Sequence, residues 1–351
     1  MADSDARASL SASYSDEPVL VTGGASFIGS RLVELLLDAG ARVTVADDLS
    51  SGHLENLADI SERIAFIQGD LRDADIAQKA SRGQRSIFHL AAMHGGRGYI
   101  DTHPVECMNN LVLDHAVYTA AAEAQVSRVV FASSACAYPT TLQSSATDRG
   151  LLPECAAGFD VQGAAFPDGE YGWAKLMGEM QARAFHKQYG MDAIACRLFT
   201  AYGPRENESH AVIALIAKAL ARLDPFPVWG DGTQTRNFTF VDDTALGMAL
   251  AGARLTGFDV LNVGSPIHTT IQELMEMIFQ ILEWAPHSID YQLDKPVGVL
   301  SRAADVTKSE RMLGWSPHIP LRDGLMRTIS WCSANLDHSR LARLDQMLMS
   351  R

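Results

Sequence analysis

Residues 18–30, which read PVLVTGGASFIGS, decide the fold of this 351-residue chain. The stretch opens with a short apolar run of strand composition, and beyond the turn apolar side chains recur at helical spacing. The turn itself contains Gly23 and Gly24, and Gly29 follows five residues later. Such a turn requires residues that tolerate positive φ, and phosphates bound at a helix N-terminus require a bare backbone to approach. The stretch therefore predicts a strand, a turn and a helix that together hold a pyrophosphate.

An acidic residue follows the second predicted strand, residues 42–46. Asp47 lies roughly 20 residues after the glycines, where a carboxylate accepts the ribose hydroxyls of a dinucleotide and repels a 2′-phosphate. This position favours NAD over NADP. The glycines alone also fit a tight turn that binds nothing, so the prediction depends on strand, helix and acid occurring together.

The composition restricts the classes of partner. The chain has 29 basic and 42 acidic residues, a net charge of -13, which argues against nucleic acid and anionic membranes as partners. An anionic substrate must therefore meet a local basic cluster. Five cysteines, an odd number without metal-ligand spacing, suit a reducing cytoplasm and predict no metal site. No apolar run approaches the ~20 residues of a membrane span, and residues 1–17 are expected to be a disordered lead-in.

Strands alternate with helices over the first part of the chain, which predicts a doubly wound parallel α/β (Rossmann) sheet. We expect residues 18–190 to be mainly the NAD-binding domain. Residues 191–345 are expected to be mainly a smaller substrate lobe, interleaved with the first because some segments return to the sheet. Further predicted elements are strands at 63–68, 86–90, 129–132, 193–198 and 260–263, helices at 107–124, 244–253 and 271–284, and loops at 91–100 and 137–168.

Polar and glycine residues follow several predicted strands, at the edge where parallel sheets bind ligands. Asp70 follows the third strand and either approaches the adenine or caps the helix of the DLRDAD segment. Ser134 follows the fifth strand. Tyr171 and Lys175 are four residues apart on one face of a predicted helix. A phenol titrates near 10, so it serves as a base at neutral pH only where a cation such as Lys175 favours the phenolate.

Several motifs resemble the extended short-chain dehydrogenases/reductases of the NAD-dependent epimerase/dehydratase family. They include VTGGASFIGS, GDLRD, FHLAA, ASSACAYP, EYGWAK, WGDGTQTRNFTFVDD and LGW, and they run from Val21 to Trp315. Within the family, ASSACAYP, MHGGRGYI and GVLSRAADVTK are most similar to GDP-mannose 3,5-epimerases. The pairing of Cys136 with His210 also resembles GDP-fucose synthases.

The resemblance implies a GDP- or UDP-linked sugar that bound NAD oxidises to a 4-ketone and then reduces again. It implies a catalytic set of Ser134, Tyr171 and Lys175, with Cys136 and His210 as the acid and base that invert a carbon next to the ketone. The implied cofactor-binding residues are Gly23, Ser26, Phe27, Ile28, Gly29, Asp47, Asp70, Leu71, Leu90, Ala91, Ala92, Tyr171 and Lys175. The implied substrate-binding residues are Gly95, Gly96, Arg97, Thr200, Trp229, Arg236 and Arg302.

Other interpretations remain open at this point. In a plain 4-epimerase, Cys136 and His210 are structural residues, the first packed under the sheet edge and the second at the start of a helix. A non-catalytic NAD-binding sensor on the same fold is a further alternative. The family's asparagine before the YGP turn is Thr200 here, which puts one substrate contact in question. Family resemblance also implies a homodimer.

Overall fold

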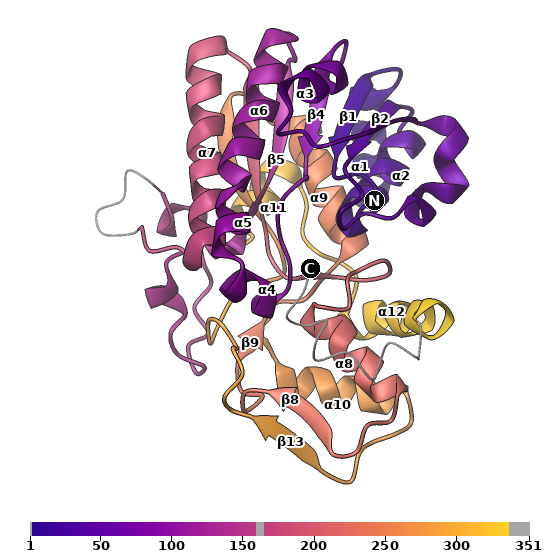
Figure 1. The fold of residues 1–351 in the computed structure, drawn as a ribbon, viewed down its shortest axis with the longest axis vertical. Coiled ribbons are helices and arrows are strands. Elements are labelled where there is room, and N and C mark those ends of the chain that lie inside the picture. The colour runs from indigo at the N-terminus through magenta and orange to yellow at the C-terminus, as the bar shows by residue number, and fades with distance from the viewer. Residues whose placement is uncertain (1, 159–164, 337–351) are drawn as a thin grey trace.

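A parallel sheet of seven strands organises the computed structural model, which describes residues 2–158 and 165–336 (Figure 1). The strand order is β11-β6-β5-β4-β1-β2-β3, and every neighbouring pair is parallel. The order reverses between β1 and β4, which places a ligand crevice at the carboxyl ends of these two strands. The predicted doubly wound fold is thereby confirmed. The strands are β1 (Pro18–Thr22), β2 (Arg42–Asp47), β3 (Ala65–Gln68), β4 (Ser86–His89), β5 (Arg128–Ser134), β6 (Asp192–Leu198) and β11 (Phe258–Val263).

Helices cover both faces of this sheet, so strand residues such as Val19, Leu20 and Val21 are fully buried. One face is covered by α2 (Phe27–Asp38), α9 (Val241–Arg254) and α11 (Thr307–Leu313). The other is covered by α3 (Ala74–Ser81), α6 (Asn110–Glu123) and α7 (Gly169–Tyr189). Gly190, at φ 72°, ends α7 in the left-handed conformation that glycine adopts most readily.

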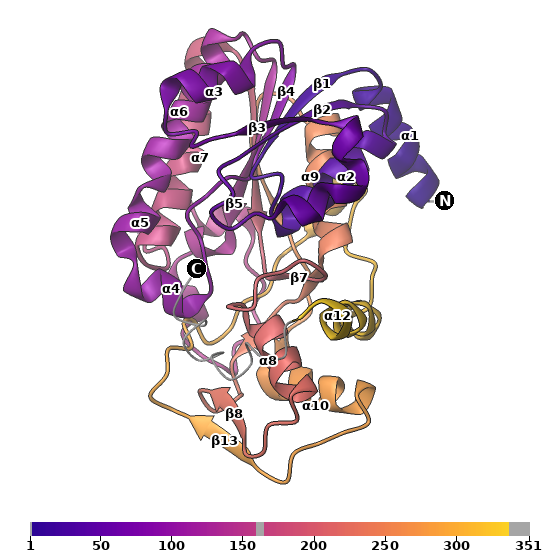
Figure 2. The same cartoon turned by 45° about the vertical axis from the view of Figure 1, so that its right-hand side comes forward.

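A smaller lobe lies at the carboxyl ends of the strands (Figure 2). Its own apolar core joins its helices to the parallel pair β8 and β13. Its main elements are α8 (Ala211–Leu220), β8 (Phe226–Trp229), α10 (Ile271–Ile281), β13 (Ile289–Gln292) and α12 (Leu321–Asn335). The remaining short strands are β7 (Ala201–Tyr202), β9 (Thr235–Arg236), β10 (Thr239–Phe240) and β12 (Thr269–Thr270). The division at residues 190 and 191 stays a prediction.

The expected disorder of residues 1–17 is wrong, because α1 (Ala2–Tyr14) is a helix that packs against α9. Ala6, Leu10 and Tyr14 recur every four residues and are buried, and the Tyr14 hydroxyl donates to the carbonyl of Ala249 at 2.7 Å. Because the segment is rich in Ser, Ala and Asp, three apolar residues spaced four apart do not stand out in its sequence. Docking on α9 stabilises a helix that would be marginal alone.

The segment between β4 and β5 also differs from prediction. Part of the expected loop 91–100 belongs to a helix, α4 (Arg97–Thr102), and the single helix expected at 107–124 is divided into α5 (Pro104–Met108) and α6. Pro104 disfavours helical conformation in the residue before it, which separates α4 from α5. The expected surface loop 137–168 includes the 3-10 turns η3 (Thr140–Gln143) and η4 (Glu154–Ala156) and buries Tyr138. Residues 159–164 of this loop and 337–345 of the expected substrate lobe lie outside the described residues.

Candidate functional site

The glycine turn after β1 leaves no room for side chains. Gly23 has φ 69°, and a Cβ there would lie 2.8 Å from the backbone nitrogen of Ala91. A Cβ on Gly29 would lie 2.1 Å from the carbonyl oxygen of Gly23. Ser26 is the N-cap of α2, and its hydroxyl bonds back to Gly23 rather than to the first amides of the helix. The helix therefore offers its N-terminal N–H groups across a bare backbone, which fits a pyrophosphate.

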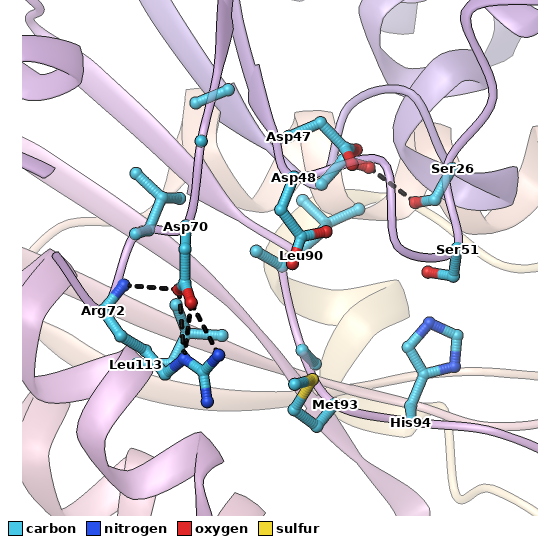
Figure 3. A pocket seen from close by; sticks show the side chains of 16 residues that line it. Ser26, Asp47, Asp48, Ser51, Asp70, Arg72, Leu90, Met93, His94 and Leu113 are labelled. Atoms are coloured by element: carbon cyan, nitrogen blue, oxygen red, sulfur yellow. Dashed lines mark hydrogen bonds and ion pairs between the residues drawn. The ribbon is translucent and has the colours of Figure 1, made fainter. Parts of the chain in front are cut away.

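Asp47 lies at the end of β2, beside this turn. Its carboxylate is 6% exposed and accepts hydrogen bonds from the backbone amides of Ala25 (3.0 Å) and Leu49 (2.9 Å). Asp47 and Ser26 both line a cavity of about 40 Å³ (Figure 3). The carboxylate thus orders the turn and also faces the position where a ribose would lie.

Asp70 lies across the same cavity and pairs with Arg72, whose Nη2 is 2.6 Å from Oδ2 (Figure 3). This hydrogen bond is the main cause that lowers the pKa of Asp70 below its ordinary value. The residue that caps α3 is Asp73, which accepts from the amide of Asp75. Of the two roles considered for Asp70, capping is wrong, and its place in the cavity fits the approach to an adenine.

A larger cavity of about 410 Å³ adjoins the first and opens toward the smaller lobe. Ser26, Leu90 and Ala92 line both cavities, so the two form one continuous crevice. Every residue predicted for catalysis or for substrate binding lines the larger cavity, and every predicted cofactor residue except Gly29 lines one or the other. Gly29 acts instead by allowing α2 to approach the turn.

The predicted catalytic residues converge at the ends of β5 and α7. The Ser134 hydroxyl accepts from the amide of Cys136 at 3.1 Å and hydrogen bonds with Tyr171. Burial raises the pKa of the Tyr171 phenol, the Cys136 and Cys107 thiols raise it further, and the bond to Ser134 opposes them. The phenol is therefore protonated in the chain on its own.

Lys175 lies one turn along α7, with its Nζ 5.8 Å from the centre of the Tyr171 ring. The ammonium is 2% exposed and donates to the carbonyl of Ala132 at 2.9 Å. Burial lowers the pKa of Lys175, and the buried carboxylate of Asp114 opposes that shift. The hydrogen bond to Ala132 thus fixes the amino group of Lys175 one helical turn from the tyrosine.

Three arginines and one carboxylate form the polar wall of the larger cavity. Asp168 bridges Arg97 (Nη1 to Oδ1, 2.7 Å) and Arg302 (Nη2 to Oδ2, 3.1 Å). Burial raises the pKa of Asp168, but the two guanidiniums outweigh burial and hold it below its ordinary value. Arg236 donates to the carbonyls of Thr235 and Val297, and burial beside Arg302 lowers its pKa to about 10. This wall fits an anionic ligand.

Cys136 stands where this wall meets the catalytic residues. Its Sγ accepts a hydrogen bond from Nη1 of Arg302 at 3.4 Å. Its carbonyl accepts from the amide of Asp168, and a Cβ on Gly172 would lie only 2.3 Å from that carbonyl. Gly172 therefore lets α7 approach closely, which keeps the thiol beside Tyr171. All five cysteines are free, and the described residues hold no group of three or more metal-ligating side chains.

His210 faces the cavity from the smaller lobe, as the N-cap of α8. Its ring makes no cap hydrogen bond; instead Nδ1 lies 2.9 Å from Oε1 of Glu206. The ring centre lies 6.2 Å from that of His94 on the glycine loop. The position of His210 at the start of the helix is as predicted, but its ring accepts no hydrogen bond from the first backbone amides of the helix.

Sequence reasoning missed three residues that shape the crevice. Asn110 exchanges hydrogen bonds with the backbone of Met93, 2.7 Å to its amide and 2.9 Å to its carbonyl, and so fixes the glycine loop. Asp168 and Glu206 are the carboxylate partners of the arginines and of His210. The signal for Asn110 was a polar residue inside an apolar helix, whereas the two acids sit in irregular segments that carry no periodic pattern.

The fit to NAD is supported by this geometry. The glycine turn and α2 would hold its pyrophosphate, Asp47 its ribose and the smaller cavity its adenine, with Tyr171 and Lys175 at the reactive end. Within the part of the chain that the structure describes, no helix is both long and apolar enough to cross a membrane.

Comparisons with known proteins identify the family of this chain. The model of the NAD-dependent epimerase/dehydratase family matches residues 19–264. GDP-mannose 3,5-epimerase 1 of Oryza sativa subsp. japonica is 32% identical over 337 residues, 93% of this chain and 84% of the rice protein. UDP-glucose 4-epimerase of Mycolicibacterium smegmatis is 31% identical over 318 residues, 89% of this chain and 97% of that protein.

Solved structures show the same similarity. The UDP-glucose 4-epimerase of Thermotoga maritima with UDP-glucose superposes with a TM-score of 0.80 at 26% identity, over 91% of this chain and 100% of that chain. The dTDP-glucose 4,6-dehydratase of Streptomyces venezuelae with NAD bound superposes with a TM-score of 0.81 at 29% identity, over 91% of this chain and 97% of that chain. The chain therefore belongs to the NAD-dependent epimerase/dehydratase family, and NAD is its cofactor.

Proposed function

We propose that this chain is a nucleotide-sugar epimerase that works through a transient 4-keto sugar, with Cys136 and His210 moving protons at a carbon next to the ketone. One observation carries the proposal. The thiol and the imidazole line the same cavity as Ser134, Tyr171 and Lys175, although they come from opposite lobes. A 4-ketone acidifies the protons on its neighbouring carbons, and inversion there needs an acid and a base on opposite faces of the sugar.

The catalytic residues divide the work by their protonation states. Bound NAD supplies the hydride acceptor and donor at the 4-position. Tyr171, protonated in the chain on its own, is ready to return a proton to the 4-oxygen when the ketone is reduced. In the opposite direction it must accept the proton of the 4-hydroxyl, and the buried ammonium of Lys175 favours that anionic state. Ser134 holds the oxygen in place.

The substrate is proposed to be a GDP- or UDP-linked sugar. Arg236 and Arg302 would hold the diphosphate, because planar guanidiniums bind such groups through paired hydrogen bonds. Arg97 and the loop before it would contact the sugar, with Thr200 and Trp229. The rice relative is a GDP-mannose 3,5-epimerase and the mycobacterial one a UDP-glucose 4-epimerase, so both nucleotides belong in the test.

Turnover in heavy water tests the proposal. The purified protein is denatured to identify any released NAD, and the native protein is incubated with GDP- and UDP-hexoses in D₂O. The products are then read by NMR. We expect inversion with deuterium at a carbon next to the 4-position, and we expect Cys136→Ser and His210→Asn to abolish the labelling.

A 4-epimerase is the second candidate, favoured by the similarity to the mycobacterial and Thermotoga enzymes. It predicts inversion at the 4-position with no deuterium in the product. That outcome would refute the roles of Cys136 and His210. Unchanged turnover in Tyr171→Phe would refute both candidates, because both require this tyrosine at the 4-oxygen. An NAD-loaded protein that turns over none of these sugars would favour the sensor instead.

The surface of the chain suggests how it assembles. Exposed apolar side chains on α5, α6 and α7, among them Val105 (70% exposed), Val112 (55%) and Trp173 (40%), offer a face for a second copy. We therefore propose a homodimer, to be checked by light scattering of Val112→Glu beside the unmodified chain.

The five free thiols support a cytoplasmic location.

A further inference from the structure

Glu206 is a buried acid on the wall of the larger cavity that no predicted role includes. Its side chain is 2% exposed, and Oε1 lies 2.9 Å from Nδ1 of His210. Its second oxygen, Oε2, is buried without a hydrogen-bond partner. Burial raises the pKa of Glu206, and the contact with His210 opposes this shift. Burying a carboxylate costs free energy unless it is paired, so the contact with His210 compensates in part for the burial of Glu206.

The surrounding backbone fixes this pair in one arrangement. The amide of His210 donates to the carbonyl of Asn207, and that of Ser209 donates to the Asn207 side chain at 2.8 Å. A Cβ on Gly96 would lie 2.1 Å from the carbonyl of Ser209, so the glycine loop packs directly against this turn. With Nδ1 occupied by Glu206 and the His210 side chain 28% exposed, the remaining ring nitrogen is the one available to the cavity.

We propose that Glu206 is a positioning residue that holds a hydrogen on Nδ1 of His210 and so presents Nε2 to the substrate as the proton-transferring atom. This inference rests on the proposed function. In the base direction, the Nε2 lone pair takes the proton of the carbon next to the ketone, and the C–H electron pair moves into the enolate. The imidazolium that forms keeps its Nδ1–H on the carboxylate of Glu206. In the acid direction, Cys136 removes the carbon proton from the opposite face of the sugar, and the protonated Nε2 donates its hydrogen to the carbon of the enolate.

The other titratable groups near the pair come from separate elements. His94 faces His210 from the glycine loop. Tyr202 of β7 and Cys332 of α12 feel the charge of Glu206, but burial is the main cause that raises both of their pKa values, to about 12 for Cys332. Glu208, in the same turn, also acts on Cys332. Among these, His94 is a second imidazole beside His210.

The first test measures the ring itself and needs no turnover. Protein labelled with ¹⁵N-histidine is studied by long-range ¹H–¹⁵N NMR in mildly alkaline buffer, with His210→Asn to assign the signals. We expect the hydrogen of neutral His210 on Nδ1, and we expect Glu206→Gln to remove this preference. A hydrogen on Nε2 in the unmodified protein would overturn the proposal, because the nitrogen facing the cavity could then not act as a base.

The second test uses deuterium incorporation as a function of pH. Glu206→Gln should slow labelling at least about tenfold and move the acidic limb of the profile to lower pH, because the amide no longer stabilises the protonated ring. Glu206→Asp should restore part of the rate, and Glu208→Gln, which removes the same charge two residues away, should match the unmodified chain. The profiles are repeated with His94→Asn, which removes any contribution of this imidazole to the pH dependence.

The outcomes separate the inference from the function on which it rests. If the unmodified chain incorporates deuterium and Glu206→Gln keeps its rate and pH profile, the inference fails and the function stands. If the unmodified chain incorporates none but shows the Nδ1 hydrogen, the function fails and the orientation of His210 by Glu206 stands. Equal NAD content and equal thermal stability of the variants show that each has folded.

Discussion

Gly29→Ala is a sharp test of the cofactor turn, because two physical effects oppose each other there. Gly29 lies inside α2, where replacing glycine by alanine normally stabilises a helix by about 1 kcal/mol. The added Cβ, however, would lie 2.1 Å from the carbonyl oxygen of Gly23 and 2.9 Å from Cα of Gly24. Both neighbours are backbone atoms of the turn, so no side chain can rotate to make room.

The size of the effect follows from the required movement. Non-bonded heavy atoms settle at roughly 3.5 Å, so the turn and the helix must separate by more than about 1 Å. Overpacking of this kind costs about 3 kcal/mol or more when the backbone must shift. After the gain in helix propensity, about 2 kcal/mol of net destabilisation remains, which lowers Tm by several degrees. The same movement displaces the amides that face the pyrophosphate.

The assay combines a thermal melt with the amount of NAD released on denaturation. We expect Gly29→Ala to lower Tm and to reduce NAD per protein to a small fraction of the original. Gly150→Ala is the matched control, since a Cβ there would meet only the Asp148 side chain at 3.2 Å. If Gly29→Ala instead raised Tm and kept its full NAD content, the reasoning that this glycine sets the approach of α2 to the turn would be refuted.

Three further substitutions test the charges around the crevice. Glu179→Gln leaves Arg197, 1% exposed and bound to both Glu179 oxygens at 2.8 Å, without its counter-charge, so urea unfolding should show a loss of about 3–5 kcal/mol. The Asp168 ion pairs hold the pKa of this carboxyl below the ordinary 3.8 in the folded chain, so they stabilise the fold above that pH. This contribution is lost as the pH falls through the pKa of Asp168 in the folded state. The Tm difference between the unmodified chain and Asp168→Asn should therefore shrink from about pH 6 to about pH 3. Arg236→Met should keep or raise Tm, because it removes a buried cation that has no carboxylate partner among the described residues. Calorimetry should nevertheless show at least about tenfold weaker nucleotide-diphosphate binding.

The sequence predicted those parts of the site that are local along the chain. The turn from Gly23 to Gly29 and the four-residue spacing of Tyr171 and Lys175 are each encoded within one short stretch, where backbone geometry or helical periodicity leaves little choice. Asp47 was predictable because the strand that carries it reads clearly as a strand. The docking of α1 was not, because its stripe of three apolar residues is too narrow to stand out in a polar segment.

The parts that could not be predicted join distant segments. Asp168 bonds to Arg97, 71 residues away, and to Arg302, 134 residues away, so the wall exists only after both lobes are in place. Glu206 is only four residues from His210, but no helix spans them, and the turn that aims one side chain at the other depends on packing against the glycine loop. Neither contact leaves a pattern in the sequence.

The arginine wall also explains how a chain with a net charge of -13 can attract an anionic substrate. Asp168 pairs with Arg97 and Arg302, and Asp101 pairs with Arg97. Among the described residues Arg236 bonds only to carbonyls, and burial beside Arg302 lowers its pKa to about 10. A lowered pKa in an arginine means that its environment opposes the charge, so an anion placed beside Arg236 would be favourable. A diphosphate bound at Arg236 and Arg302, as proposed, would offset that repulsion. The excess positive charge is therefore confined to the place where a nucleotide sugar would need it, and Cys136, which accepts a hydrogen bond from Arg302, lies where this wall meets Ser134 and Tyr171.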